Sequence, residues 1–215
     1  MPLLDALSTE QRQRLLASAR LRRFARNEVL FHEGDPADSL QVITRGRVAV
    51  RVGSELGAGV TVDVLGRDDI LGELALLTPG SSRAATVVAL EVTETMVVTA
   101  SQFASLRAEH AGIEDALIAI LVERSRHTSA RLVEALTVSA DRRVLRRLVD
   151  LALVYAREHA DLVIPLTQDD LAGMAGTTRE TVNRTLRREA DRGTVTVGRG
   201  RVTVLDVDAL TRRSR

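Results

Sequence analysis

The hydrophobic and polar positions follow different periods in different parts of the chain. From about Leu21 to Thr99, short apolar runs such as RVAVRV, VTVDVL and TMVVTA alternate with Gly, Asp, Pro and Ser. Short strands at regular spacing with turn residues between them are typical of an antiparallel sandwich or barrel. A short helix is expected before them, because Ser8 and Gln11 form a capping-box pattern. We therefore predict a sandwich or barrel of antiparallel strands that follows an N-terminal helix.

After Ser101 the apolar positions recur every three or four residues, which indicates helices. One helix, from about Ile113 to Val138, has no Gly or Pro inside it. Its apolar stripe spans several heptads, as in the seam of a coiled coil. The stripe predicts a homodimer with an interface at Leu117, Ile120, Leu121, Thr128, Leu132 and Ala135. The alternative is that the helix packs on its own barrel.

Two short helices joined by a tight turn are predicted near the C-terminus. Thr167 caps the first of them, and Asp170 stands at its third position. Gly176 supplies the turn, and the second helix runs from Thr178 to about Arg192. Two helices with this connection form a helix-turn-helix. The run TVTVGRGRVTVLD that follows predicts a hairpin, which would be a wing beside the helices.

The second of these helices has two different faces. Val182, Leu186 and Ala190 recur every four residues and are predicted to point inward. The opposite face is rich in Arg, whose guanidinium can pair with guanine, while a carboxylate can accept from cytosine. A charged, solvated helix face is the plain alternative. The residues predicted to contact DNA bases or phosphates are Thr167, Gln168, Thr177, Thr178, Arg179, Glu180, Asn183 and Arg184.

Charge is distributed unevenly along the 215 residues. The net charge is +1, and all 30 basic residues are Arg. Residues 1–139 hold 15 Arg and 18 acids, a net charge of −3, whereas residues 140–215 hold 15 Arg and 11 acids, a net charge of +4. A basic C-terminal part favours a polyanionic partner there.

Composition excludes several classes of protein. The chain has no Cys, which rules out disulfides, a thiol nucleophile and a cysteine-ligated iron–sulfur cluster. Its four His share no metal-ligand spacing, so no metal site is predicted. No apolar run approaches the roughly 18 residues of a membrane helix, and the N-terminus, which contains acids and is amphipathic, does not resemble a signal peptide. A cytoplasmic protein without membrane partners is expected.

The segment GELALLTPGSSRAAT, residues 72–86, combines one acid and one base with small residues. Small residues allow a ligand to approach the backbone closely. The guanidinium of Arg83 can hold a phosphate, and the carboxylate of Glu73 can accept from hydroxyl groups. A ligand with a phosphate and a sugar hydroxyl would use both. The plain alternative is an ion pair between Glu73 and Arg83 that joins two strands.

Taken together, these motifs resemble the cyclic-AMP receptor protein/FNR (CRP/FNR) family of transcription regulators over essentially the whole chain. The resemblance rests on FHEGDPADSLQVITRGRVAV, GELALL…SRAAT and TTRETVNRTL. It implies an α+β protein with a cyclic-nucleotide-binding domain over residues 1–110, an antiparallel, jelly-roll-like β-roll. A dimerisation helix and hinge would follow over 111–138, and a winged helix-turn-helix over 139–215. It also implies no enzymatic activity.

The resemblance further implies cAMP as an allosteric effector, with no other cofactor. Arg83 would neutralise the cyclic phosphate and Glu73 would accept from the ribose 2′-hydroxyl. Thr128, and Ser129 from the partner subunit, would contact the adenine. The other residues expected against the nucleotide are Gly72, Leu74 and Ala84. Ala84 departs from the Ser or Thr usual in bacterial receptors, so one hydroxyl contact to the phosphate is missing.

The implied partners are a palindromic operator with TGTGA-like half-sites and RNA polymerase. Three alternatives stay open on the sequence. The regulator could bind DNA constitutively or with another effector, or it could be a haem gas sensor. From another class, a cupin-like metalloenzyme could use His32 and Glu33. A cyclic-nucleotide-gated channel is excluded by the lack of membrane helices.

Overall fold

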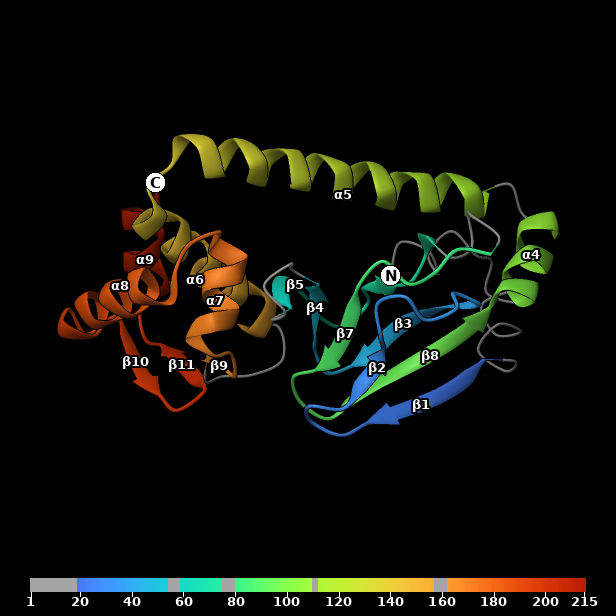
Figure 1. Cartoon of the computed structure of the whole chain (residues 1–215), viewed down its shortest axis with the longest axis horizontal. Helices are drawn as coiled ribbons and strands as arrows, with labels where there is room; N and C mark the ends of the chain where they lie inside the picture. Colours follow the sequence, from blue (N-terminus) through green and yellow to red (C-terminus); the bar gives the residue numbers. More distant parts are fainter. Residues whose placement is uncertain (1–18, 54–58, 75–79, 110–111, 157–161) are drawn as a thin grey trace. The chain divides into compact units, whose positions relative to one another are not determined.

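The computed structural model describes residues 19–53, 59–74, 80–109, 112–156 and 162–215 (Figure 1). The helix predicted around Ser8 lies outside these residues. Contacts group the chain into two compact units, one of residues 1–53 and 65–129, the other of residues 54–64 and 130–215.

The first unit contains two antiparallel sheets, as predicted for the β-roll. In the first sheet, β8 (Thr93–Thr99) lies between β1 (Arg20–Phe24) and β3 (Ser39–Arg45), and β6 (Ile70–Leu71) pairs with the other edge of β3. The register places Leu21 opposite Met96.

In the second sheet, β7 (Thr86–Ala89) pairs with both β2 (Val29–Phe31) and β4 (Val48–Val52). The pairing of β2 with β7 shifts register between Val29 and Phe31. The predicted strands are therefore confirmed, and β1 and β6 are additional.

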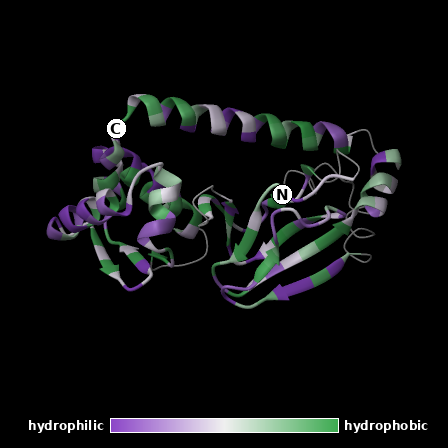
Figure 2. Cartoon of the chain, in the orientation of Figure 1, coloured by the Kyte–Doolittle hydropathy of each residue, from purple (hydrophilic) through white to green (hydrophobic). Residues whose placement is uncertain are grey.

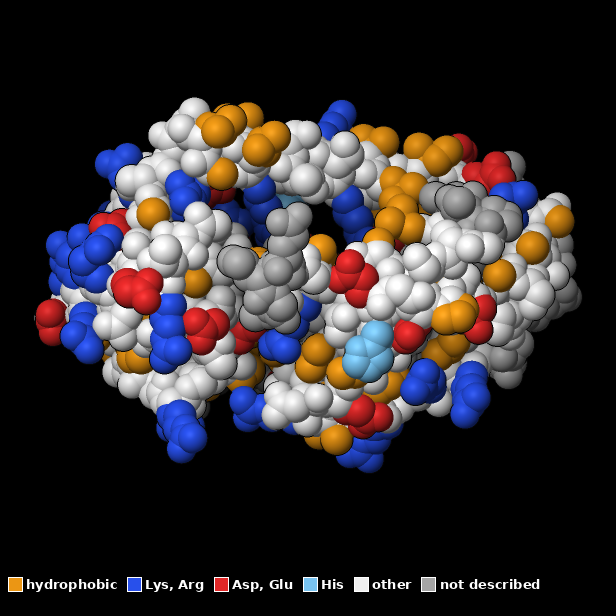
Figure 3. Space-filling model, viewed as in Figure 1, with side chains coloured by type: hydrophobic (Ala, Val, Ile, Leu, Met, Phe, Trp, Pro, Cys, Tyr) orange, Lys and Arg blue, Asp and Glu red, His pale blue; other side chains and the backbone are white. Residues whose placement is uncertain are grey.

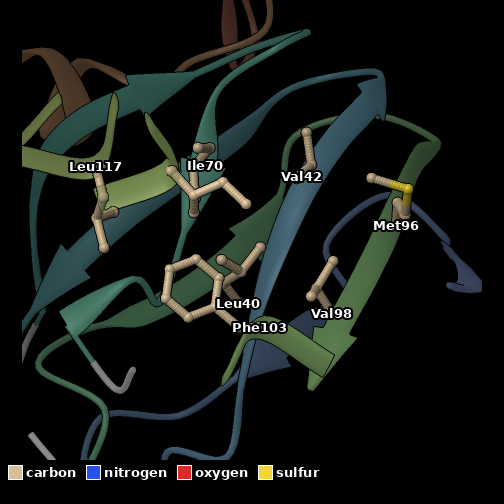
Figure 4. Close-up of a cluster of buried hydrophobic side chains, with 8 residues drawn as sticks. Leu40, Val42, Ile70, Met96, Val98, Phe103 and Leu117 are labelled. Carbon is tan, nitrogen blue, oxygen red and sulfur yellow. The ribbon is translucent and has the colours of Figure 1, made fainter. Parts of the chain in front are cut away.

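One hydrophobic core of the first unit joins the first sheet to two helices. Leu40, Val42, Ile70, Met96 and Val98 come from the first sheet, Phe103 from α4 (Ala100–Glu109), and Ile113 and Leu117 from α5 (Gly112–Thr137) (Figure 4). Each large side chain buried in this way contributes about 1.5–3 kcal/mol. The start of α5 is thus anchored to its own β-roll.

This packing corrects the predicted dimer seam. Leu117 is only 2% exposed, so its side chain is not available to a partner helix. Ile120 and Leu121 are partly buried against the same core. Further along α5, Leu132 is 62% exposed, and Thr128 and Ala135 are also exposed. The predicted apolar stripe of α5 therefore has a first part that faces the core and a later part that is exposed. Figure 2 shows hydrophobic positions along both parts of this helix.

The second unit contains the predicted helix-turn-helix and wing. Its helices are α6 (Ala140–Ala156), α7 (Gln168–Ala175), α8 (Arg179–Asp191) and α9 (Val207–Ser214). The core includes Leu148, Leu171, Leu186 and Leu210, each of which has no exposed surface.

A small sheet completes this unit. Strand β11 (Arg201–Val204) lies between β10 (Val195–Gly198) and β9 (Val163–Ile164), which confirms the predicted hairpin. Residues 60–64 of β5 (Val60–Leu65) also belong to the second unit. There the Thr61 hydroxyl donates to Asp170 Oδ1 at 2.7 Å. The hydrophobic period of β5 did not predict this contact.

No helix among the described residues is long and apolar enough to cross a membrane.

Candidate functional site

The backbone around Arg83 is held by a short antiparallel ladder. The Arg83 amide donates to the Asp35 carbonyl at 2.8 Å, and the Gly34 amide donates to the Arg83 carbonyl at 2.9 Å. The guanidinium is then fixed by Ser39, whose carbonyl accepts from Nη1 at 2.6 Å and whose hydroxyl accepts from Nη2 at 3.1 Å. It also lies over the ring of Phe31, 4.4 Å from the centroid. These contacts place a cation in one defined position.

Arg83 is buried but incompletely hydrogen-bonded. It is 6% exposed, and in the part of the chain that the structure describes its Nε has no hydrogen-bond partner. Burial lowers the pKa of the Arg83 guanidinium, and the charges of Asp38, Asp35 and Glu73 oppose this shift. Arg remains protonated at neutral pH. A buried cation with an unpaired N–H donor is suited to binding an anion, whose oxygen atoms can accept that hydrogen bond.

Gly72 makes room for this guanidinium. Its φ of +72° is a conformation that residues with side chains rarely adopt, and a Cβ there would lie 2.1 Å from Arg83 Nη1. The predicted close approach at Gly72 is therefore an approach of Arg83 itself. Gly80, with a φ of +76°, has nothing within 4 Å of the same position and provides a comparison.

Gly72→Ala is expected to destabilise the protein by about 1–3 kcal/mol more than Gly80→Ala does, because only the first adds a clash to the backbone strain. Urea unfolding of the two variants measures the difference. Equal losses would mean that Arg83 yields to the new methyl group at no cost.

Glu73 does not pair with Arg83, so the plain alternative of an ion pair between these two residues is wrong. Glu73 is 4% exposed, and its Oε1 accepts from Arg124 Nη1 of α5 at 2.5 Å. Arg124 Nη2 also donates to the Ile70 carbonyl. The nearest carboxylate to Arg83 is instead that of Asp38, at 3.6 Å. Arg124 thus ties the long helix to the segment that carries Glu73.

Sequence reasoning did not predict Arg124 as a site residue. The one signal was that Arg124 interrupts the apolar stripe of the long helix with a charge. The structure brings Gly72, Glu73, Arg83 and Arg124 to one region. Thr128, one turn after Arg124, is exposed and donates to the Arg124 carbonyl at 2.9 Å.

The remaining residues of the predicted nucleotide site are accessible. Leu74 is 49% exposed, and Ala84 and Ser129 are also exposed. Their contact with a nucleotide stays a prediction.

The helix-turn-helix has the predicted caps. The Thr167 hydroxyl accepts from the Asp170 amide at 3.1 Å, and Asp170 Oδ2 accepts from the Thr167 amide at 3.0 Å. Gly176 adopts the left-handed conformation, with φ 57° and ψ 48°, and ends α7. Thr178 then caps α8. Caps of this kind contribute about 1 kcal/mol each and set where the two helices begin and end.

The inward face of α8 differs from the prediction at one position. Val182 and Leu186 have no exposed surface, as expected. Ala190 is exposed, and Thr185 and Glu189 are buried in addition. An α-helix has 3.6 residues per turn, so residues spaced four apart rotate gradually around the helix. Ala190, the third of them, has therefore turned away from the core.

The outward face of α8 forms a shallow groove of polar side chains. Figure 3 shows basic side chains gathered over this helix. The groove is lined by Gln168, Arg179, Glu180, Asn183, Arg184, Arg187, Arg188 and Asp191. Five of the eight predicted DNA-contacting residues are therefore together in one groove, while Thr167, Thr177 and Thr178 lie at the helix starts beside it.

Several of these side chains are already held in place. Asn183 Nδ2 donates to Gln168 Oε1 at 3.1 Å, which joins α8 to α7. Arg179 Nη1 lies 3.3 Å from Asp169 Oδ2. Hydrogen bonds from its own backbone amide and from the Thr178 hydroxyl lower the pKa of Glu180. Glu180 is therefore ionised at neutral pH and acts only as an acceptor.

Arg184 and Arg188 share a carboxylate that sequence reasoning missed. Asp141, at the start of α6, lies 3.3 Å from Arg184 Nη2 and 3.1 Å from Arg188 Nη2. Burial alone would raise the pKa of Asp141, but hydrogen bonds from Thr185, Arg188 and Arg184 outweigh it and lower the pKa. Asp141 is 43 to 47 residues before the side chains that it contacts on α8, so no local pattern connects them.

Among the described residues, no group of three or more His, Cys, Asp or Glu side chains could hold a metal ion.

Comparison with known proteins assigns both units. Residues 21–110 match the cyclic nucleotide-binding domain family, and residues 142–213 match the Crp-like helix-turn-helix domain family. The chain is 30% identical over 197 residues to the CRP-like cAMP-activated global transcriptional regulator of Mycobacterium tuberculosis, covering 89% of this chain and 87% of that protein.

Two solved structures share the architecture. The Thermus thermophilus catabolite activator protein is 28% identical with a TM-score of 0.57, covering 100% of this chain and 98% of that one. The c-di-GMP responsive global regulator CLP of Xanthomonas campestris is 19% identical with a TM-score of 0.77, covering 93% and 100%. At this identity, CLP shows likeness of fold alone.

Proposed function

Because the chain belongs to the CRP/FNR family of transcription regulators, a non-enzymatic family, we propose that it is a cAMP-responsive homodimer that binds palindromic DNA in the cytoplasm. The operator would carry TGTGA-like half-sites, and RNA polymerase would be a further partner. The observation that carries the effector part is Arg83, a buried cation whose Nε has no partner in the described structure. Membership of this family also sets the cupin-like metalloenzyme aside.

The charges around Arg83 and Glu73 suit a cyclic nucleotide. Arg83 offers positive charge and a free donor to the phosphate, and Glu73 offers acceptors to a ribose hydroxyl. Glu73 pairs with Arg124 and its side chain is only 5% exposed, so these acceptors lie in a buried place. The mycobacterial relative, described as cAMP-activated, makes cAMP the first nucleotide to test.

Another effector is the second candidate, and Ala84 favours it. Ala84 offers no hydroxyl where bacterial cAMP receptors usually have one, so part of the expected phosphate contact is missing. The same fold serves a c-di-GMP responsive regulator in Xanthomonas campestris. This candidate keeps the DNA-binding part of the proposal and changes only the ligand.

The test is DNA affinity in the presence of each nucleotide. A short DNA is selected from a random library by the wild-type protein, and its Kd is measured with cAMP, cGMP, c-di-GMP or no nucleotide. Tighter binding with cAMP alone supports the proposal, and tighter binding with c-di-GMP supports the second candidate. Equal affinity in all four conditions would indicate a constitutive regulator.

The dimer part of the proposal rests on exposed apolar side chains of α5. Ile118, Val122, Leu132 and Leu136 are 58%, 45%, 62% and 78% exposed. Together with the exposed Ser125 and Ser129 they follow a four-three spacing, the repeat of a coiled-coil seam. A twin helix from a second copy fits this repeat. Ser129 lies within it, which agrees with its expected role towards the partner's nucleotide.

Leu132→Glu is expected to convert the dimer to monomer at micromolar concentration, because it places a charge in the apolar seam. Sedimentation velocity measures the mass. Leu153→Glu is the matched control, since Leu153 is 60% exposed on α6, outside the seam. A dimer that survives Leu132→Glu would rule out this seam.

Each dimer would present two copies of α8 about 34 Å apart, in successive major grooves. The first turns of α8 then meet the base edges, and the capping residues Thr167 and Thr178 meet phosphates.

Arg179→Ala is expected to weaken binding to the selected DNA by about 1–3 kcal/mol and to relax the base preference at one position of each half-site. Arg179 is exposed in the first turn of α8, in the groove described above. Competition among single-base variants of the site measures the preference. Arg212→Ala in α9 is the control of equal charge, and an unchanged preference in Arg179→Ala would refute base reading by this residue.

A further inference from the structure

Asp141 is the one acid of α6 that contacts the DNA-facing helix among the described ion pairs. Its Oδ1 accepts from the Thr185 hydroxyl at 2.9 Å and from Arg184 Nη2 at 3.3 Å, and its Oδ2 accepts from Arg188 Nη2 at 3.1 Å. The carboxylate is 30% exposed, so it lies near the surface, beside Arg184 and Arg188, and not in the core.

Arg184 and Arg188 are one turn apart and therefore on the same face of α8. Both line the groove, and their side chains are 65% and 43% exposed. Two guanidinium groups at this spacing repel each other, and each long side chain has many rotamers in water. One carboxylate between them offsets the repulsion and restricts both side chains.

The geometry leaves Arg184 available to DNA. Asp141 receives a hydrogen bond from Nη2, which carries two N–H groups, so the second of them can form a fork with guanine together with Nη1 or Nε. Thr185 has no exposed surface, and its bond to Asp141 fixes the carboxylate relative to the helix axis. Asp141 is therefore placed to set the direction of Arg184 without touching a base.

We propose that Asp141 is a positioning residue for sequence reading, which acts through Arg184 and rests on the DNA-binding function proposed above. It raises the affinity for the correct base at the Arg184 position. As a negative charge near phosphates, it does not raise affinity for DNA in general.

The test compares wild-type protein with Asp141→Asn on two DNAs, the site selected by the wild type and a scrambled site of the same length. Asn keeps an oxygen acceptor for Thr185, so the contact between α6 and α8 is preserved. The ratio of the two affinities is expected to fall about two- to fivefold, the upper part of the range for a partly exposed ion pair. Affinity for the scrambled DNA is expected to stay the same or to rise.

A double-mutant cycle with Arg184→Ala separates positioning from a structural role. If Asp141 acts through Arg184, Asp141→Asn has no further effect on the ratio once Arg184 is Ala. Asp150→Asn is the matched control, because Asp150 is on α6 and pairs with Arg147 instead of α8. It is expected to leave the ratio unchanged.

The outcomes distinguish the two levels of the proposal. A wild type that binds both DNAs equally overturns sequence-specific binding, and the role of Asp141 with it. A specific wild type whose ratio does not change in Asp141→Asn overturns the positioning role alone. A loss that persists in the Arg184→Ala background also overturns it, because Asp141 would then support α8 as a whole.

Discussion

Arg83→Ala is expected to weaken cAMP binding by at least about 30-fold, equivalent to about 2 kcal/mol or more. The wild-type guanidinium is buried, held by Ser39 and stacked on Phe31, and its Nε has a hydrogen to donate. A phosphate in this place would be desolvated, so its charge depends on Arg83. Loss of the cation would leave that charge without compensation.

Isothermal titration of purified protein with cAMP measures this loss, with cGMP as the comparison nucleotide. Arg26→Ala, an exposed Arg outside the site, is the matched control. Arg83→Lys covers the case in which the Ala variant fails to fold, because Lys keeps the charge and loses the planar fork. It is expected to bind cAMP with an affinity between those of wild type and Arg83→Ala. Wild-type affinity in a folded Arg83→Ala protein would remove Arg83 from the ligand site.

The second large effect is expected at Glu189, the buried carboxylate of α8. Glu189 has no exposed surface and accepts from Arg213 at 2.5 Å, from the Thr194 hydroxyl at 2.8 Å and from Arg192 at 2.9 Å. Glu189→Gln is expected to destabilise the DNA-binding unit by about 2–4 kcal/mol, because it leaves two guanidinium groups facing a neutral amide. The value is below that of a fully buried pair, since Arg213 and Arg192 are partly exposed.

The loss of stability caused by Glu189→Gln should become smaller as the pH falls. Burial by itself raises the pKa of Glu189, but hydrogen bonds from Arg213, Thr194 and Arg192 outweigh it, so the folded pKa lies below the ordinary value of 4.5. The unfolded chain therefore binds this proton first as the pH falls. The stabilisation is fully present above about pH 4.5 and is lost as the pH drops through the folded pKa.

Urea unfolding of wild type and Glu189→Gln at pH 7 and at pH 4 measures both the loss and its pH dependence. The difference between the two proteins should be smaller at pH 4. Asp191→Asn, an exposed acid on the same helix, controls for the change in charge. A difference that is the same at both pH values would mean that the cost of Glu189→Gln arises from packing and not from charge.

Most of the fold followed from patterns within about a dozen residues. The runs in β3, β4, β7 and β8 alternate as strands, and α5 and α6 repeat as helices. The strand β1 was missed because Arg20, Arg22 and Arg23 hide its alternation, and β6 because its two residues are too few to show a period. β1 forms because its backbone completes the edge of β8.

The residues of the candidate sites divide in the same way. Gly72, Glu73 and Arg83 lie in one short segment, and the caps Thr167 and Thr178 bound two helices, so residue type and spacing were enough to predict them. Arg124 and Asp141 were not predictable in this way, because each meets its partners more than 40 residues away in the chain. A charge on a helix has no preferred partner until the helix has packed.

The sequence by itself therefore determined the order of the elements, the ends of the helix-turn-helix and the residues suited to phosphate and to DNA, because periodicity, caps and side-chain chemistry act locally. Only the tertiary structure decided that Leu117 serves the β-roll core, that Glu73 pairs with Arg124 and not with Arg83, and that Asp141 holds Arg184. These choices depend on which faces the packed elements turn towards one another, and burial of apolar surface over the whole unit sets those faces.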